Sequence, residues 1–418
     1  MKEHMIEYLL AHHRFLNIIA IGAIIMIGYL FSSNRRAIVW RTIFTALGLQ
    51  ILFAFCMLRI SYGAQAVAFI ARGVSILYQV AEQGSRFVFG SLVDAAGPWG
   101  FLFAFKVLPI IIFFGAFMAV LFHLGIVQII VGAINRLLMP LLGTAGAESV
   151  CAIANSFLGQ TEAPLLIRHY LGGMSRSELF VVMVSGMATI SGSILAVFAA
   201  MGVPAEHMLT ASIMAIPGSI LVAKLLIPQE GPTVSTPSIE AQTGKGNIFD
   251  ALAQGTIDGL QLALNVAAML IVFISFITLA DTILAAVSNS IANTLWSAMP
   301  LLSLRTIFGF LFAPVAYGLG FVGVDAFAAG QLLGTKVVIN ELVAYQQMLT
   351  MGLSERAVAI LTYALCGFAN FSCIGIQIGG IGALAPQQRP ALTQLGLRAV
   401  FASTLVNLLS ACIAALLL

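Results

Sequence analysis

The chain has 418 residues, of which 60% are hydrophobic and only 8% are charged. An average soluble domain carries about 25% charged residues, and the mean hydropathy of this chain is +1.04. These values exclude a soluble protein and indicate an integral membrane protein. The net charge of +3 says little about partners, and we expect no nucleic acid among them.

Long apolar runs approach the roughly 20 residues that a membrane-spanning helix needs, and the alternating segments of a β-barrel are absent. The sequence therefore predicts an all-α integral membrane protein with eight transmembrane helices. In chain order the expected spans are Phe15–Phe31, Ala37–Leu58, Phe101–His123, Leu179–Met201, Leu209–Ile227, Leu260–Ala286, Ala357–Ile378 and Ala391–Leu417.

The charge distribution predicts the orientation of these spans. An even number of crossings brings both termini to one side of the membrane. The basic segment "SSNRRAIVWR", the polar loop at residues 228–247 and the segment "PQQRPALTQLGLR" then fall on the opposite side. Because cytoplasmic loops carry an excess of Lys and Arg, we expect these loops to be cytoplasmic and both termini to face outward.

A polar stripe lies between the second and third spans. Gln65, Arg72, Gln79 and Arg86 recur every seven residues in an otherwise mostly apolar segment. This pattern favours an amphipathic helix in the membrane interface. The alternative, a spanning helix whose polar groups face a pore, stays open.

Two apolar regions, residues 141–173 and 307–349, are interrupted by Gly and polar residues, and each carries a Glu. Non-helical backbone at membrane depth is tolerated only where protein or a water-filled cavity satisfies its polar groups. Both regions are therefore predicted to be re-entrant hairpins, which enter and leave the membrane by the same face.

A constant offset relates the two hairpins and the helices after them. The pairs Glu162 and Glu341, Ser175 and Ser354, and Ser191 and Asn370 are all 179 residues apart (341 − 162, 354 − 175, 370 − 191). Each unit reads as a hairpin with a Glu, a Ser-capped helix start and a span interrupted by small polar residues. Three crossings separate the hairpins, so the units have opposite orientations. An inverted-topology repeat with broken helices is typical of secondary transporters.

This repeat predicts the organisation of the whole chain. Residues 1–140 would hold spans one to three with interfacial amphipathic helices, 141–227 the first repeat unit, 228–247 a cytoplasmic loop, 248–300 the sixth span, and 301–418 the second repeat unit.

The polar residues of the two units suggest what the cavity binds. Amides and hydroxyls donate and accept, whereas carboxylates only accept, so the set suits a neutral solute with OH and NH groups. A hard cation would also find oxygen ligands there. Structural pairing of Glu162 with Arg168, or of Glu341 with Lys336, remains an alternative. Three further charged residues have no counterpart in the repeat, and we expect them to form structural contacts rather than part of the site: Lys106, Arg305 and Asp281.

The segments "NSFLGQTEAPLLI", "GTKVVINELVAY" and "CGFANFSCIGIQIGG" resemble the signature segments of the concentrative nucleoside transporters, in the same order along essentially the whole chain. The resemblance implies a homotrimer of eight-span protomers, each with two re-entrant hairpins, surrounded by membrane lipid. It also implies import of nucleosides coupled to a cation. The length suits the bacterial branch, which implies an inner membrane with periplasmic termini.

The resemblance further implies roles for individual residues. Gln160 and Thr161 would hold the nucleobase, Glu162 would reach it through water, and Ile194 would pack near it. Glu341 and Asn370 would bind ribose hydroxyls, with Phe368 lining the site. Where many members have a second Ser after "GFANFS", this chain has Cys373, a much weaker hydrogen-bond partner, so the ribose contact there is in question.

For the coupling ion the resemblance implies sodium, held by the side chains of Asn155 and Thr189 and by the carbonyls of Leu158 and Ile190. Some proton-coupled members lack this Asn, so sodium is preferred over protons. Uridine, cytidine and adenosine are the expected substrates. A proton-coupled symporter, a transporter of another neutral polar solute and a channel remain alternatives, whereas no enzyme motif such as H-E-x-x-H supports hydrolysis.

Overall fold

The computed structural model describes residues 7–8, 10–94, 97–100, 102–144, 146–231, 247–294 and 302–418, and every regular element within them is a helix. Most of the predicted cytoplasmic loop, residues 232–246, lies outside the described residues. The all-α fold predicted from the sequence is confirmed.

The first part of the chain forms helices on the outside of the molecule. They are η1 (Ala11–His13), α2 (Arg14–Leu30), η2 (Arg35–Ala37), α3 (Trp40–Leu58), α4 (Ser61–Phe89), η3 (Gly90–Val93), α5 (Phe103–Lys106) and α6 (Leu108–His123).

Two series of helices come next, separated by the long helix α13 (Ile248–Thr294). The first series is α7 (Ile126–Leu142), α8 (Gly146–Asn155), η4 (Ala163–Ile167), α9 (Arg168–Leu171), α10 (Arg176–Ala188), α11 (Gly192–Met201) and α12 (Ala205–Leu226). The second is α14 (Leu304–Gly318), α15 (Gly323–Val338), α16 (Glu341–Thr350), α17 (Glu355–Leu365), α18 (Ser372–Leu384), η5 (Pro386–Gln388) and α19 (Arg389–Leu417).

Seven of the eight predicted spans coincide with helices that are long and apolar enough to cross a membrane. The seventh, predicted at Ala357–Ile378, is divided into α17 and α18 by the non-helical residues 366–371. The interruption predicted from "NFSC" therefore separates two short helices. The segment Ser61–Val93 also has the length and hydropathy of a span, so these two criteria alone do not identify an interfacial helix.

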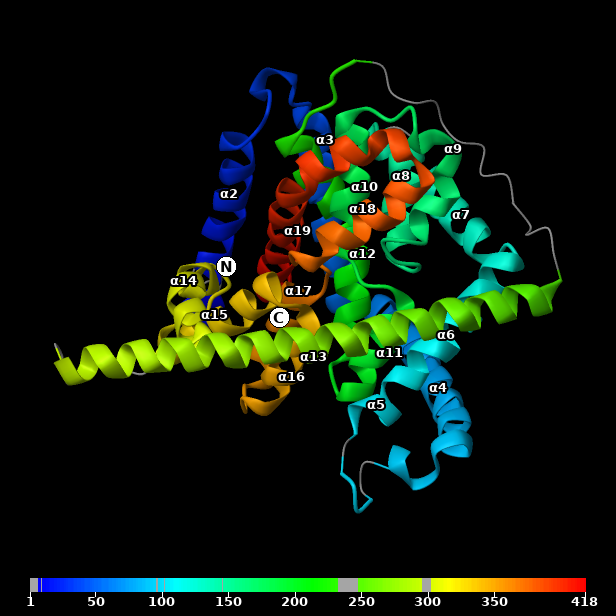
Figure 1. Ribbon diagram of the computed structural model, residues 1–418. Helices are drawn as coiled ribbons and strands as arrows, with labels where there is room; N and C mark the ends of the chain where they lie inside the picture. Colours follow the sequence, from blue (N-terminus) through cyan, green and yellow to red (C-terminus); the bar gives the residue numbers. More distant parts are fainter. Residues whose placement is uncertain are drawn as a thin grey trace.

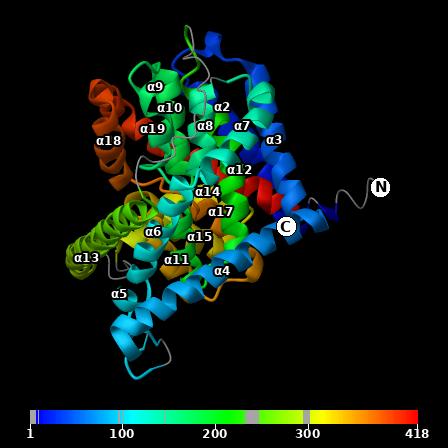
Figure 2. The same ribbon diagram turned by 90° about the vertical axis from the view of Figure 1, so that its right-hand side faces the viewer.

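The course and exposure of α4 fit the interfacial interpretation. In Figure 2 α4 runs obliquely to the helices of the central bundle. All four residues of the predicted stripe, Gln65, Arg72, Gln79 and Arg86, are exposed, whereas its buried positions include Val67. The polar stripe therefore faces outward and lines no internal pore of this chain.

The core consists of α10, α12, α17 and α19, which stand in the middle of the bundle in Figure 1. Among the 18 most apolar consecutive residues of α10 and α11, 94% are buried. Among the corresponding 18 residues of α13, only 12% are buried. Figure 1 shows α13 crossing the outside of the bundle. An apolar surface this exposed suits lipid or a further protein copy rather than water.

The repeat predicted from the sequence recurs in the order of the helices. α10 and α17 begin 179 residues apart (355 − 176), and each has the predicted Ser as its N-cap. Ser175 forms the predicted capping box with Glu178. In both series the predicted hairpin precedes a helix that breaks and resumes, α10 as α11 and α17 as α18. The predicted hairpin 1 contains α8 to α9, and the predicted hairpin 2 contains α15 and α16. α14 precedes hairpin 2, and α14 and α15 are bent by 111° at their break.

The predicted cytoplasmic loops meet at one end of the molecule. The amide of Ser33, after α2, donates to the carbonyl of Leu226 at the end of α12 (2.9 Å). Gln388, before α19, donates to the carbonyl of Met174 (3.0 Å). The Tyr8 hydroxyl donates to the carbonyl of Leu416, so the two ends of the chain are neighbours. These contacts agree with an even number of crossings.

Candidate functional site

The candidate site is built where the helices of the two series break. Ser191 accepts a hydrogen bond from the amide of Ile194 and begins α11 after the break in α10. Gly159 lies opposite, with a φ of +109°, and a Cβ there would stand 2.9 Å from the Ser191 Cβ. Because only glycine adopts this backbone without strain and without that clash, the hairpin can approach the break closely.

Gln160 connects the first hairpin to the second series. It is 7% exposed, and its Nε2 contacts the Sγ of Cys373 at 3.4 Å. Its Oε1 accepts a hydrogen bond from the Nε2 of Gln377 at 3.2 Å, and Gln377 also donates to the carbonyl of Met183. The amide of Gln160 is thus oriented with its donor toward Cys373.

Glu341 and Asn370 form the second part of the site. The Nδ2 of Asn370 donates to the Oε2 of Glu341 at 2.9 Å. The Oδ1 of Asn370 accepts from the hydroxyl of Ser372 (2.6 Å) and from the backbone amide of Cys373 (3.1 Å). Through Cys373 this group joins the group around Gln160, so predicted nucleobase and ribose residues from both series lie together.

The side chains of the other four predicted substrate residues make no hydrogen bond to this network in the described part of the chain, although the backbone carbonyl of Phe368 accepts from the amide of Asn370 (2.8 Å). Thr161 is exposed and lies close to α18. A Cβ added at Gly380 would stand 3.1 Å from the methyl carbon of Thr161. Glu162 is half-buried, Ile194 is 6% exposed, and Phe368 is partly buried against the core. Hydrogen bonds that involve side chains therefore link four of the eight predicted substrate residues in one network.

The structural pairings that remained open do not occur. The ion pairs within 4.0 Å among the described residues include neither Glu162 with Arg168 nor Glu341 with Lys336. Lys106 instead pairs with Glu82 at 2.6 Å. Asp281 accepts from the amide of Leu304 at the start of α14, so both residues serve the scaffold as expected.

The residues predicted to hold a cation present oxygen atoms at the break after α10. The Oδ1 of Asn155 is buried and has no hydrogen-bond partner, while its Nδ2 donates to Ser185. The Thr189 hydroxyl contacts the carbonyls of Asn155 (3.0 Å) and Ser185 (2.9 Å).

The backbone supplies further oxygens at the same break. In the described part of the chain the carbonyls of Leu158 and Ile190 accept no hydrogen bond, and both residues are non-helical. α10 ends at Ala188 with the negative end of its dipole at this point. Unpartnered oxygens beside a helix C-terminus fit a hard cation such as sodium.

Two buried polar residues were missed by the sequence analysis. Gln377 is 0% exposed and contacts Gln160, and Asn407 of α19 is 2% exposed and contacts both helix breaks. Their only signal in the sequence is an amide side chain within a strongly apolar run. Since polar residues inside a membrane are costly, that signal alone marks candidates.

Comparison with known proteins shows the family of the chain. Residues 207–415 match the sequence family described as Na+ dependent nucleoside transporter C-terminus. Residues 19–92 match the corresponding N-terminal family, and residues 104–205 match a family described as Gate: Nucleoside recognition. The chain belongs to the concentrative nucleoside transporter family.

Individual relatives cover nearly the whole chain. An uncharacterized transporter of Haemophilus influenzae is 44% identical over 409 residues, which cover 96% of this chain and 97% of the relative. The nucleoside permease NupC of Helicobacter pylori is 38% identical over 411 residues, with 96% and 97% covered. Human solute carrier family 28 member 3 is 34% identical over 423 residues, 96% of this chain and 60% of that protein.

A solved structure shares the fold. CNTnw in an inward-facing, substrate-bound state superposes with a TM-score of 0.91 at 38% identity, covering 96% of this chain and 97% of that one. The family is one of transporters rather than of enzymes. The chain is therefore a multi-pass membrane transporter with bacterial relatives, and the family predicted from the signature segments is confirmed.

Proposed function

We propose that the protein imports nucleosides, with uridine, cytidine and adenosine as substrates, by symport with sodium. The observation that carries the proposal is the hydrogen-bonded chain Gln160–Cys373–Asn370–Glu341, which spans both series of helices. One end presents an amide that suits a nucleobase edge. The other end presents a carboxylate and an amide that suit ribose hydroxyls. Thr161, Glu162, Ile194 and Phe368 complete the proposed substrate site.

The proposed driving ion is sodium, held by the side chains of Asn155 and Thr189 and the carbonyls of Leu158 and Ile190. In this proposal the ion supplies the positive charge that orients these oxygens. The support is the group of buried oxygens without hydrogen-bond partners beside the end of α10. The protein holds the ion next to the first hairpin, where its presence can bias how the hairpin binds substrate.

The proposal includes a homotrimer in the bacterial inner membrane with periplasmic termini. Large apolar side chains of α13 remain exposed in the single chain, for example Phe276 (65%) and Leu279 (55%). Such a surface requires either lipid or a further copy of the chain. The particle mass in detergent, with chemical cross-linking in membranes, tests the trimer. Labelling of single cysteines introduced at Ser33 and at Tyr8 from each side of the membrane tests the orientation.

The experiment that tests the function is uptake of labelled uridine into proteoliposomes that contain the purified chain. Accumulation above the external concentration under an inward sodium gradient, with none in choline, supports sodium symport. Uptake that follows an imposed pH gradient instead would assign the coupling to protons. Competition by cytidine and adenosine but not by amino acids is expected, and equilibration without accumulation would indicate a channel.

A further inference from the structure

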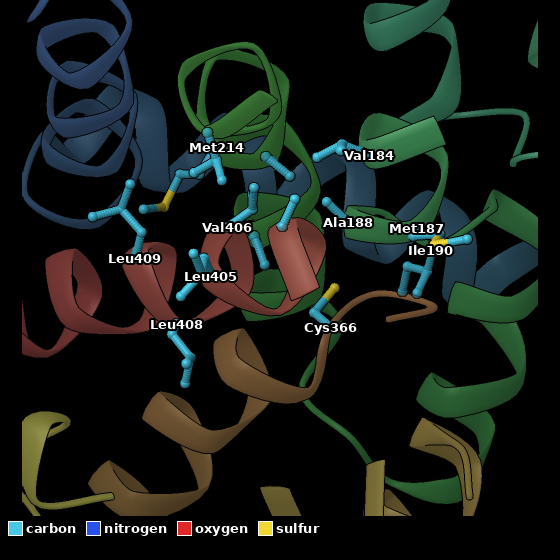
Figure 3. Close-up of a cluster of buried hydrophobic side chains, with 14 of the residues drawn as sticks. Val184, Met187, Ala188, Ile190, Met214, Cys366, Leu405, Val406, Leu408 and Leu409 are labelled. Atoms are coloured by element: carbon cyan, nitrogen blue, oxygen red, sulfur yellow. The ribbon is translucent and has the colours of Figure 1, made fainter. Parts of the chain in front are cut away.

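A single buried amide joins the two helix breaks. The Nδ2 of Asn407, on α19, donates to the carbonyl of Ala188 at 2.8 Å and to the carbonyl of Cys366 at 2.7 Å. Ala188 is the last residue of α10, and Cys366 follows the last residue of α17. Figure 3 shows Ala188 and Cys366 beside the turn of α19 that carries Val406. The carbonyls released by the two interruptions therefore share one donor group.

The backbone packs closely on this amide at Gly367. Gly367 has a φ of +146°, and a Cβ there would stand 2.7 Å from the Ala188 oxygen and 2.8 Å from the Asn407 Oδ1. The two breaks thus approach each other at a glycine, and Asn407 is held between them.

Lys336 places a positive charge at the second break. It is 1% exposed, and its Nζ donates to the Oδ1 of Asn407 (2.5 Å) and to the carbonyl of Ala364 (3.0 Å). Both partners are acceptors, and Ala364 lies in the last turn of α17, where the helix dipole is negative. The described residues offer Lys336 no carboxylate within 4.0 Å. The negative end of α17 and, beyond ion-pair distance, the carboxylate of Glu341 are its counter-charges.

In each of the two series, the helix that precedes the Glu carries a polar residue that reaches the helix break. The first arm of hairpin 1, α8, ends with Asn155, which lies at the break after α10 beside oxygens that have no hydrogen-bond partner. The first arm of hairpin 2, α15, carries Lys336 in its last turn, at the break after α17. One break thus has the oxygen ligands for a mobile cation, and the other already holds a covalently attached ammonium group.

We propose that Lys336 is a tethered cation that occupies, in the second series, the place that the coupling ion takes in the first. Asn407 is the positioning residue that fixes both breaks relative to each other. The inference rests on the proposed sodium symport and adds to it one consequence, namely that each protomer couples uptake to one cation. A purely structural role for Lys336 predicts that a neutral side chain of similar volume would serve equally well.

Amine binding tests this inference without any transport assay. In Lys336→Ala the atoms removed correspond to n-propylammonium, and the apolar groove lined by Lys336, Val337 and Ala364 gives a small amine access. Purified Lys336→Ala should unfold at a lower temperature than the unsubstituted protein. Addition of n-propylammonium chloride should raise its unfolding temperature, whereas n-propanol and choline chloride should not. The unsubstituted protein in n-propylammonium is the control and should not shift.

Transport provides the second measurement. Lys336→Met keeps the apolar stem and removes the charge, and it should lower maximal uridine uptake roughly tenfold or more without a matching loss of uridine affinity. For the unsubstituted protein, the charge moved per uridine should be one. A wild-type rate in Lys336→Met, equal effects of the amine and the alcohol on Lys336→Ala, or two charges per uridine would overturn the inference. If the unsubstituted protein takes up no uridine, the proposed function fails, while the amine-dependent unfolding still decides the role of Lys336.

Discussion

Among single residues, Glu341 has the contacts that best explain a role in recognition. Its carboxylate is 5% exposed and accepts from Asn370 at 2.9 Å. A carboxylate only accepts hydrogen bonds, so its remaining lone pairs suit the O–H donors of a ribose. The negative charge of Glu341 therefore fits the proposed role in binding the ribose.

Replacing this charge tests that role. Glu341→Gln should weaken uridine binding by roughly 10- to 100-fold, because a hydrogen bond to a charged group contributes about 1.5–3 kcal/mol. Calorimetry on the purified protein and uptake in proteoliposomes measure it. Glu355→Gln, an exposed Glu in the first turn of α17, is the matched control and should bind normally. Wild-type affinity in Glu341→Gln would remove Glu341 from the site.

Cys373 provides a second test of the same network. The Nε2 of Gln160 contacts its thiol at 3.4 Å, and a hydroxyl would accept this hydrogen bond better. Cys373→Ser should preserve uridine affinity or improve it by up to about fivefold, which corresponds to about 1 kcal/mol. Cys412→Ser, on α19, replaces an equally buried thiol and is the control. A marked loss of affinity in Cys373→Ser alone would contradict the assignment.

The sequence predicts which residues belong to the candidate site better than it predicts which residues they contact. Polar residues at membrane depth are costly, so Gln160, Glu162 and Asn370 are conspicuous in an apolar chain. The contact between Gln160 and Gln377, 217 residues apart, has no local signature. Gln377 was missed because one amide in an apolar helix forms no pattern, and only the fold shows that it orients Gln160.

At the scale of elements, the long apolar spans were predictable from hydropathy, and the shorter helices were not. α7 has 17 residues and contains Asn135, Arg136 and Pro140, so it falls below the roughly 20 residues expected of a span. The sequence predicted no element there. Its place before hairpin 1 matches that of α14 before hairpin 2, and we propose that the first repeat unit begins with α7 rather than at residue 141.

The packing of α13 on α6 gives a prediction for elements. Gly255 and Gly259 form a GxxxG pair on α13, and a Cβ on Gly259 would stand 2.9 Å from backbone atoms of Ile112. Small residues at this spacing let helix backbones approach closely in a membrane. Gly259→Leu should therefore separate the helices and lower the unfolding temperature. Gly73→Leu on α4, where a Cβ meets nothing within 4 Å, is the control, and equal effects of the two would contradict this packing role.

At the scale of the whole molecule, both helix breaks and the network of predicted substrate residues lie within one buried unit. Asn407 contacts the ends of α10 and α17, and Gln160 contacts Cys373 across the two series. A change at the proposed sodium site therefore has a short route to the proposed substrate site. Chains of packed and hydrogen-bonded side chains of this kind carry energetic coupling between sites.

Sodium dependence tests that coupling. Asn155→Ala and Thr189→Ala should raise the sodium concentration for half-maximal uridine uptake more than they change substrate recognition at saturating sodium, because each removes a proposed oxygen ligand. Asn17→Ala is the matched control. Asn17 is 0% exposed, donates to the carbonyl of Gly318 and has an Oδ1 without a partner, but it lies on α2, which carries none of the proposed sodium ligands. Its sodium dependence should stay unchanged.

Thermodynamic linkage makes the same prediction in the absence of transport. If sodium and uridine bind to coupled sites, sodium tightens uridine binding, and uridine tightens sodium binding by the same factor, about 5- to 150-fold for typical couplings. Calorimetry with uridine in sodium chloride and then in choline chloride measures the first factor, and sodium titration with and without uridine measures the second. In Asn155→Ala both factors should fall toward one together, since the lost ligand acts on both. Equal uridine affinity in sodium and choline, together with uptake that follows a pH gradient, would exclude sodium and assign the coupling to a carboxylate such as Glu162 or Glu341.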